Sequence, residues 1–99
     1  MTAFEPSEDQ LIELAATGDP SAVKTLLEQH RERLLHMVTV RMDLRVVQRL
    51  DASDVVQDSL LEAHEKFAEY AGTRPLPFYP WLRQIAWQHL MHAHERRSR

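Results

Sequence analysis

The chain has 99 residues and a formal net charge of −3 at pH 7, which fits one small domain with a modest core. It contains no cysteine, which excludes disulfides and thiolate chemistry and makes a reducing cytoplasm the expected location. No apolar run approaches the roughly 20 residues of a membrane span, and the acidic start is unlike a signal peptide. With only 2 glycines and many good helix formers, the chain is expected to be helical.

Charge is divided unevenly along the chain. Residues 1–71 carry 7 Lys and Arg against 14 Asp and Glu, whereas residues 72–99 carry 5 Arg against one Glu. An acidic body with a basic end indicates two partners of opposite charge, although a small domain can also show such a difference by chance.

Capping signals and the spacing of apolar residues predict four helices, so the expected fold is an all-α, compact four-helix bundle-like single domain. The predicted helices cover residues of about 8–17, 20–42, 52–70 and 79–97. A capping box, a glycine after the last turn and an Asp-Pro start mark the boundaries of the first two helices. These signals are Ser7 with Gln10, then Gly18, then Asp19 with Pro20.

Two connections precede the later helices. Residues 43–51 form either a short helical turn or an irregular connection that ends at the expected N-cap, Asp51. Residues 71–78 hold a glycine and two prolines and predict a stiff loop, after which the last helix begins near Phe78 or Pro80. The expected buried stripes of the last three helices are Val23, Leu26, Leu27, His30, Leu34, Met37 and Val38; Val56, Leu60, Ala63, Phe67 and Tyr70; and Leu82, Ile85, Ala86, His89, Leu90 and Ala93.

The outward face of the third predicted helix is acidic. A rotation of 100° per residue places four carboxylates and one leucine opposite the core stripe. These residues are Asp54, Asp58, Leu61, Glu62 and Glu65, with Gln57 at the edge. Such a charge run is usually a solvated surface, but a leucine ringed by carboxylates also suits contact with a basic helix of a partner protein.

The loop and the last helix combine aromatic, amide and basic side chains. Rings can stack on unpaired bases, amides can read base edges, and cations can hold phosphates. The outer face of the last helix carries Gln84, Trp87, Gln88, Met91 and Glu95, and Arg74, Phe78, Tyr79 and Trp81 precede it. Phe78 and Trp81 could instead be core aromatics, and Trp87 could be a dimer contact.

Neither a metal site nor an active site is expected. His89 and His92 share a helix face, but His94 points elsewhere and no carboxylate completes a ligand set. His30 and His89 fall on apolar stripes, where a hydrogen-bonded core histidine is the commoner outcome. No catalytic motif or phosphate-binding glycine loop stands out, so the chain is not expected to be an enzyme or to need a cofactor.

The motifs "DVVQD" in the third predicted helix and "FYPWL" with a closing arginine pair in the fourth form an ordered set. This set resembles region 2 of bacterial RNA polymerase sigma factors, most closely the extracytoplasmic-function (ECF) class, and the resemblance covers about residues 8–97. It implies a transcription initiation factor domain that docks on the clamp helices of the polymerase β′ subunit. It also implies binding to the non-template strand of the minus-ten promoter element, with at least one base flipped out of the stack.

The resemblance assigns roles to two sets of residues. The polymerase-binding set is Asp54, Gln57, Asp58 and Leu61. The DNA-binding set is Arg74, Tyr79, Trp81, Arg83, Gln84, Trp87, Gln88, Arg96 and Arg97. In this family an anti-sigma factor can also cover region 2, and full-length ECF factors continue beyond region 2 into a second helical domain.

Two other interpretations stay open at this point. One is a helical protein–protein interaction module without DNA binding, self-associating through Trp87 and Met91. The other is a metal-dependent helical enzyme, which would need a bound metal.

Overall fold

The computed structural model describes residues 7–42 and 52–97, with side chains described as far as Ala93. Within these ranges the regular structure is helical and contains no strand, which confirms the all-α prediction. The helices are α1 (Glu8–Ala16), α2 (Pro20–Gln29), α3 (Arg31–Arg41), α4 (Ala52–Thr73) and α5 (Phe78–Arg97).

The predicted boundaries of the first two helices are confirmed. The Ser7 backbone N–H donates to the Gln10 side-chain oxygen at 2.8 Å, and the Gln10 N–H donates to the Ser7 hydroxyl at 3.2 Å. This reciprocal capping box satisfies two backbone donors that the helix itself cannot pair. Gly18 follows α1 with φ +100°, a conformation that costs a glycine little. Asp19 then caps α2 by accepting the Ser21 N–H at 3.0 Å.

The prediction of one continuous helix over 20–42 was wrong at a single residue. His30 ends α2 and begins α3 with φ −106° and ψ 0°. Its ring nitrogen lies 2.7 Å from a carboxylate oxygen of Glu8, and its ring packs 5.3 Å from that of Phe78, measured between centroids. The chain therefore bends where one side chain bonds to α1 and packs on α5.

α4 ends later than predicted, at Thr73 instead of Tyr70, so the loop shortens from 71–78 to 74–77. The Arg74 N–H still donates to the Tyr70 carbonyl at 2.7 Å. Arg74 then takes a left-handed conformation with φ +41°. It precedes Pro75, and a residue before proline is disfavoured in the right-handed helical region, so α4 does not continue. Residues 43–51, with the expected cap Asp51, lie outside the described residues.

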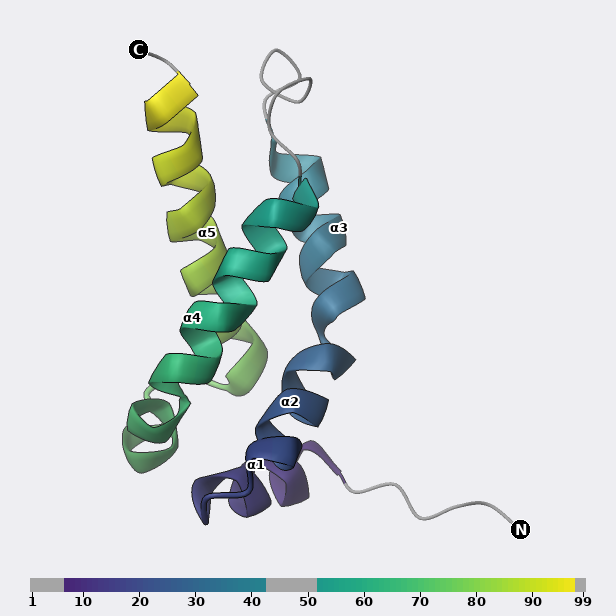
Figure 1. Ribbon diagram of the computed structural model, residues 1–99, viewed down its shortest axis with the longest axis vertical. Helices are drawn as coiled ribbons and strands as arrows, with labels where there is room; N and C mark the ends of the chain where they lie inside the picture. Colours follow the sequence, from purple (N-terminus) through teal and green to yellow (C-terminus); the bar gives the residue numbers. More distant parts are fainter. Residues whose placement is uncertain (1–6, 43–51, 98–99) are drawn as a thin grey trace, which may run out of the picture.

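α4 is the central element and contacts each of the other four helices. It crosses between α5 and the α2–α3 pair, while α1 lies across the base (Figure 1). Every residue of its predicted stripe is buried, and the stripes on the other helices are buried apart from half-exposed His30, Met37 and His89. Both flanks of α4 are thus covered, and its outer face stays open. In the described ranges, no helix has the length and apolar character needed to cross a membrane.

Candidate protein and nucleic-acid interfaces

The outer face of α4 carries an exposed set of polar and acidic side chains, called here the acidic strip. Its members are Asp54, Gln57, Asp58, Leu61 and Glu65. Leu61 is 57% exposed and lies between Asp58 and Glu65 along this face of the helix. The strip therefore offers a partner protein an apolar contact that has carboxylates before and after it along α4.

A shallow groove of about 160 Å³ runs beside the acidic strip, between α4 and the α2–α3 junction. Leu61 and Gln57 form part of its α4 wall, and Lys24 and Arg31 stand on the opposite side. The Arg31 guanidinium is already paired with Glu28 at 3.2 Å. The groove adds a depression next to Leu61 into which a partner side chain could fit.

Glu62 does not belong to the acidic strip, contrary to the prediction from helical spacing. It turns toward α5, where one carboxylate oxygen accepts the Lys66 ammonium at 2.8 Å and the other lies 2.7 Å from His89 Nε2. The hydrogen bond from Lys66 is the main reason that the pKa of the Glu62 carboxyl lies below its ordinary value of 4.5. Partial burial acts in the opposite direction, and His89 adds to the lowering. Glu62 thereby ties α4 to α5.

Glu62→Gln is expected to flatten the acid side of the stability profile. Because the folded pKa is lower than the unfolded one, ionised Glu62 contributes stability above about pH 4.5 that is lost as the pH falls through the folded value. Thermal melts between about pH 5.5 and pH 3 should show a steeper loss of Tm for the native sequence than for the variant. Glu13→Gln, at an exposed carboxylate of α1, is the control and should follow the native profile. Parallel profiles for all three proteins would contradict the role of Glu62.

The aromatic residues at the start of α5 divide between core and surface. Phe78 is 1% exposed and packs against Tyr70, which confirms the interpretation of Phe78 as a core residue. Trp81 is half-buried, and its ring stacks on Tyr70 with centroids 4.5 Å apart and planes at 28°. The Tyr70 hydroxyl donates to the Leu76 carbonyl at 2.7 Å, so Tyr70 holds both Trp81 and the loop in place. Burial raises the pKa of this hydroxyl.

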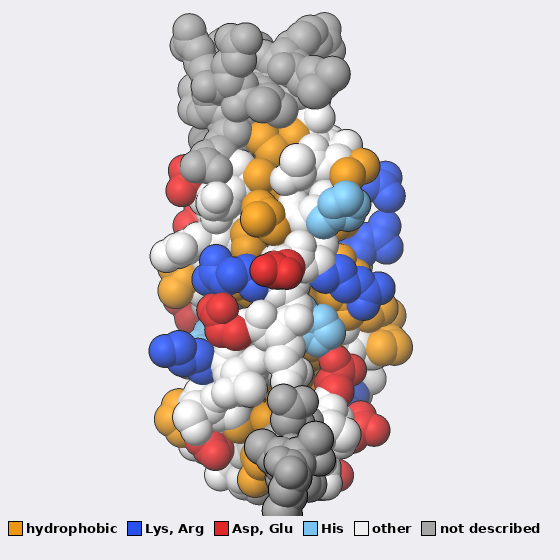
Figure 2. Space-filling view, turned by 90° about the vertical axis from the view of Figure 1, so that its right-hand side faces the viewer, with side chains coloured by type: hydrophobic (Ala, Val, Ile, Leu, Met, Phe, Trp, Pro, Cys, Tyr) orange, Lys and Arg blue, Asp and Glu red, His pale blue; other side chains and the backbone are white. Residues whose placement is uncertain are grey.

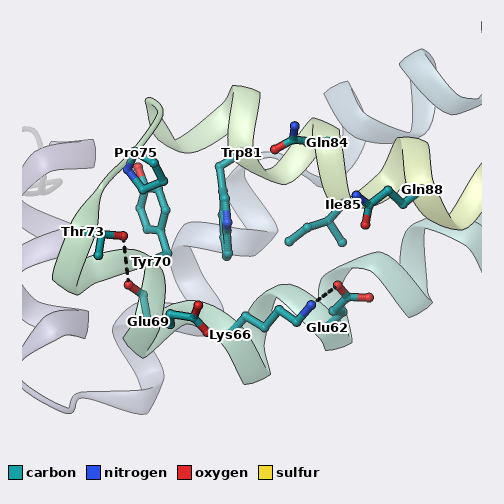
Figure 3. Close-up of a pocket in the computed structure, with 10 residues that line it drawn as sticks. All are labelled: Glu62, Lys66, Glu69, Tyr70, Thr73, Pro75, Trp81, Gln84, Ile85 and Gln88. Carbon is teal, nitrogen blue, oxygen red and sulfur yellow. Dashed lines mark hydrogen bonds and ion pairs between the residues drawn. The ribbon is translucent and has the colours of Figure 1, made fainter.

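An open groove of about 260 Å³ lies between α4 and α5 next to the Trp81 ring. α5 carries Trp81, Gln84 and Gln88 along one side, and α4 faces them with charged side chains (Figure 3). The groove thus combines a ring with two amides that can both donate and accept hydrogen bonds. Its lining is Glu62, Lys66, Glu69, Tyr70, Thr73, Pro75, Trp81, Gln84, Ile85 and Gln88.

A second open hollow, of about 270 Å³, lies on the side of α5 that faces α3. Trp87 is 40% exposed and lines it together with Arg83 and Gln84. Gln84 also lines the groove beside Trp81, so the two depressions are neighbours on α5. The structure thus brings five of the predicted DNA-binding residues onto one helix around two adjoining depressions.

The other predicted DNA-binding residues are placed differently. Tyr79 lies apart from the Trp81 groove: it is half-buried against the His30 ring, with centroids 5.7 Å apart. Arg74 is exposed in the loop. The side chains of Arg96 and Arg97 lie outside the described residues.

The histidines show no arrangement for a metal in the described part of the chain, where no three potential ligands cluster. His89 pairs with Glu62, as expected for a hydrogen-bonded histidine on an apolar stripe, and His92 is exposed. The His94 side chain is not among those described.

Together these features define a small all-α domain with two chemically different surfaces. Residues 26–99 match the family model described as Sigma-70 region 2. Over 84 residues, or 85% of the chain, the sequence is 30% identical to an ECF RNA polymerase sigma-E factor of Haemophilus influenzae. The matched segment spans 41% of that relative's length. No solved structure gives a significant match.

The chain therefore belongs to the Sigma-70 region 2 family, and the predicted resemblance to the ECF class is confirmed. The fold and this match thus identify the chain as a sigma-type region 2 domain.

Proposed function

We propose that this domain docks on the clamp helices of the RNA polymerase β′ subunit through the acidic strip and holds the non-template strand of the minus-ten promoter element on α5. The observation that carries the proposal is the position of Trp81. Its ring is stacked on Tyr70 yet lines an open groove that also exposes the Gln84 and Gln88 amides. An aromatic ring that is already held in position, next to hydrogen-bonding amides, is suited to binding an unpaired base.

The energies favour capture of a strand that is already open. Unstacking a base from duplex DNA costs a few kcal/mol, and stacking it on an aromatic side chain returns about 1–3 kcal/mol. The two terms are comparable, so the domain alone should bind single strands and melt duplex poorly. Docking on the polymerase would then supply the additional binding energy that opening requires.

The acidic strip supports the docking half of the proposal. Exposed Asp54 and Asp58 lie one helical turn apart on one face of α4, with Leu61 nearby. Charges around an apolar contact steer a basic partner and fix its orientation. The sigma resemblance supports the proposal, because it implies this role for the same face and the β′ clamp helices as the partner.

The strand-binding half can be tested with labelled oligonucleotides. We expect weak, salt-sensitive binding of the 99-residue chain to a minus-ten-like single strand, measured by fluorescence anisotropy. Three phosphate contacts would give a log–log salt slope of about −2. Duplex DNA of the same sequence and scrambled single strands are the controls. Equal affinity for all three would contradict base capture.

A further inference from the structure

Two arginines of α3 lie over aromatic rings of α5. The Arg33 guanidinium carbon is 3.7 Å from the centroid of the Tyr79 ring, and that of Arg41 is 5.8 Å from the centroid of the Trp87 ring. Both arginines are exposed. Lys and Arg side chains gather on the right-hand part of the molecular face shown in Figure 2, which looks at the side where α2 and α3 lie in Figure 1.

The two contacts repeat with the same spacing. Eight residues separate Arg33 from Arg41 on α3, and eight separate Tyr79 from Trp87 on α5. The two helices contact each other and run in the same direction (Figure 1). The Arg41–Trp87 contact therefore lies about 12 Å along the helices from the Arg33–Tyr79 contact. That distance corresponds to roughly three or four steps of a stacked nucleic-acid strand at about 3.4 Å each.

Neither arginine has a carboxylate partner among the described residues, in contrast to Arg31, which pairs with Glu28. A guanidinium that stacks on a ring keeps the N–H donors at its edge available, and these donors match the geometry of a phosphate. The ring contacts therefore place two positive charges beside α5 without neutralising them, the contact of Arg33 being the closer of the two.

The hollow beside Trp87 connects this pair to the rest of α5. Its lining is Arg41, Pro80, Arg83, Gln84 and Trp87, and Gln84 is shared with the groove at Trp81. A strand with a base in the Trp81 groove could pass Gln84 and enter the hollow. There it would meet Trp87 as a stacking surface and the arginines of α3 and α5 as cations.

We infer that α3 forms part of the nucleic-acid site, with Arg33 and Arg41 binding phosphates of the single strand whose bases lie on α5. The inference rests on the proposed function, because it requires that a strand binds α5. It adds a second helix to the site and gives the strand a track between α3 and α5. Neither arginine was predicted from the sequence, because only the packing of α3 against α5 places them beside the rings.

The test compares Arg33→Gln and Arg41→Gln with Arg31→Gln, a matched control that removes one positive charge from the same helix. Strand affinity is measured by anisotropy between about 50 and 200 mM salt. Each test variant should reduce the log–log salt slope by about 0.7 and weaken binding on the order of five- to tenfold at the low-salt end. The control should keep the native slope. Arg41→Lys, which retains the charge, should also keep it.

Two failures can be told apart in the same experiment. If the native chain prefers the minus-ten strand but Arg33→Gln and Arg41→Gln behave like Arg31→Gln, the role of α3 is overturned and the proposed function stands. If the native chain shows no preference for the minus-ten strand, the proposed function fails and the inference falls with it. Circular dichroism of each variant checks that the helices are intact.

Discussion

Replacing Asp54 and Asp58 together with arginine is expected to weaken binding to a β′ clamp-helix fragment by about 100-fold or more. The change puts like charges against a basic partner, which costs several kcal/mol, and about 1.4 kcal/mol corresponds to a tenfold change in affinity. Both side chains are exposed, so the fold should survive. Asp54 lies in the first turn of α4, where a positive charge opposes the helix dipole, so a stability loss of up to about 1 kcal/mol is expected.

The effect of changing the net charge has to be distinguished from the effect of changing these two positions. The matched control is Glu13→Arg with Glu32→Arg, which changes the net charge by the same amount at exposed sites on α1 and α3. This control should bind the clamp-helix fragment within a fewfold of the native chain. If the Asp54/Asp58 variant binds the fragment as tightly as the native chain, the acidic strip is not part of the docking surface. If both variants lose the same affinity, net charge and not a specific contact is responsible.

Leu61 distinguishes a docking surface from a solvated one. A purely electrostatic strip would lose its affinity at high salt, because exposed charges are screened over about 8 Å at physiological ionic strength. A contact centred on a leucine that is 57% exposed would keep part of its affinity, because burial of apolar surface does not depend on screening. In the proposed docking, the acidic strip would thus combine orientation by charge with affinity from one apolar side chain.

The parts of the fold that the sequence predicted correctly depend on local chemistry. The capping box of Ser7 with Gln10 and the Asp19 cap involve residues two or three positions apart, so they can be read directly from the chain. The buried stripes of α4 and α5 repeat with the helical period over about three to four turns, which leaves little ambiguity about the inward face.

The predictions were wrong where the local structure depends on residues that are distant in the sequence. The bend at His30 depends on Glu8, 22 residues earlier, and on the Phe78 ring. Glu62 lies at the edge of the outward face of α4, and its orientation depends on His89, a residue of the neighbouring helix α5. Tyr79 and Trp81 are two residues apart on the same helix, yet the structure packs one against the α2–α3 junction and leaves the other beside a groove.

Phe78→Ala is expected to remove most of the stability of the domain. The ring is 1% exposed and packs against His30, Phe67, Tyr70 and Trp81, so its loss would leave a cavity where the α2–α3 junction meets α4 and α5. Truncating a buried phenylalanine costs about 3–5 kcal/mol, against a total of about 5–15 kcal/mol for a typical domain. Urea or thermal unfolding followed by circular dichroism measures the loss. A change below about 1 kcal/mol would contradict the central position of Phe78.

Trp87→Ala, on the same helix as Phe78, is expected to have the opposite effect: little loss of stability and a clear loss of strand affinity. Trp87 is 40% exposed, and its described ring contact is with Arg41, so its removal should cost only about 1 kcal/mol of stability. Its loss should instead weaken single-strand binding by about 1–3 kcal/mol, the usual contribution of one stacked base. A stability loss above about 3 kcal/mol with unchanged strand affinity would make Trp87 a structural residue like Phe78. Because the two aromatic residues share one helix, that reversal could not be attributed to a difference in how well α5 itself forms.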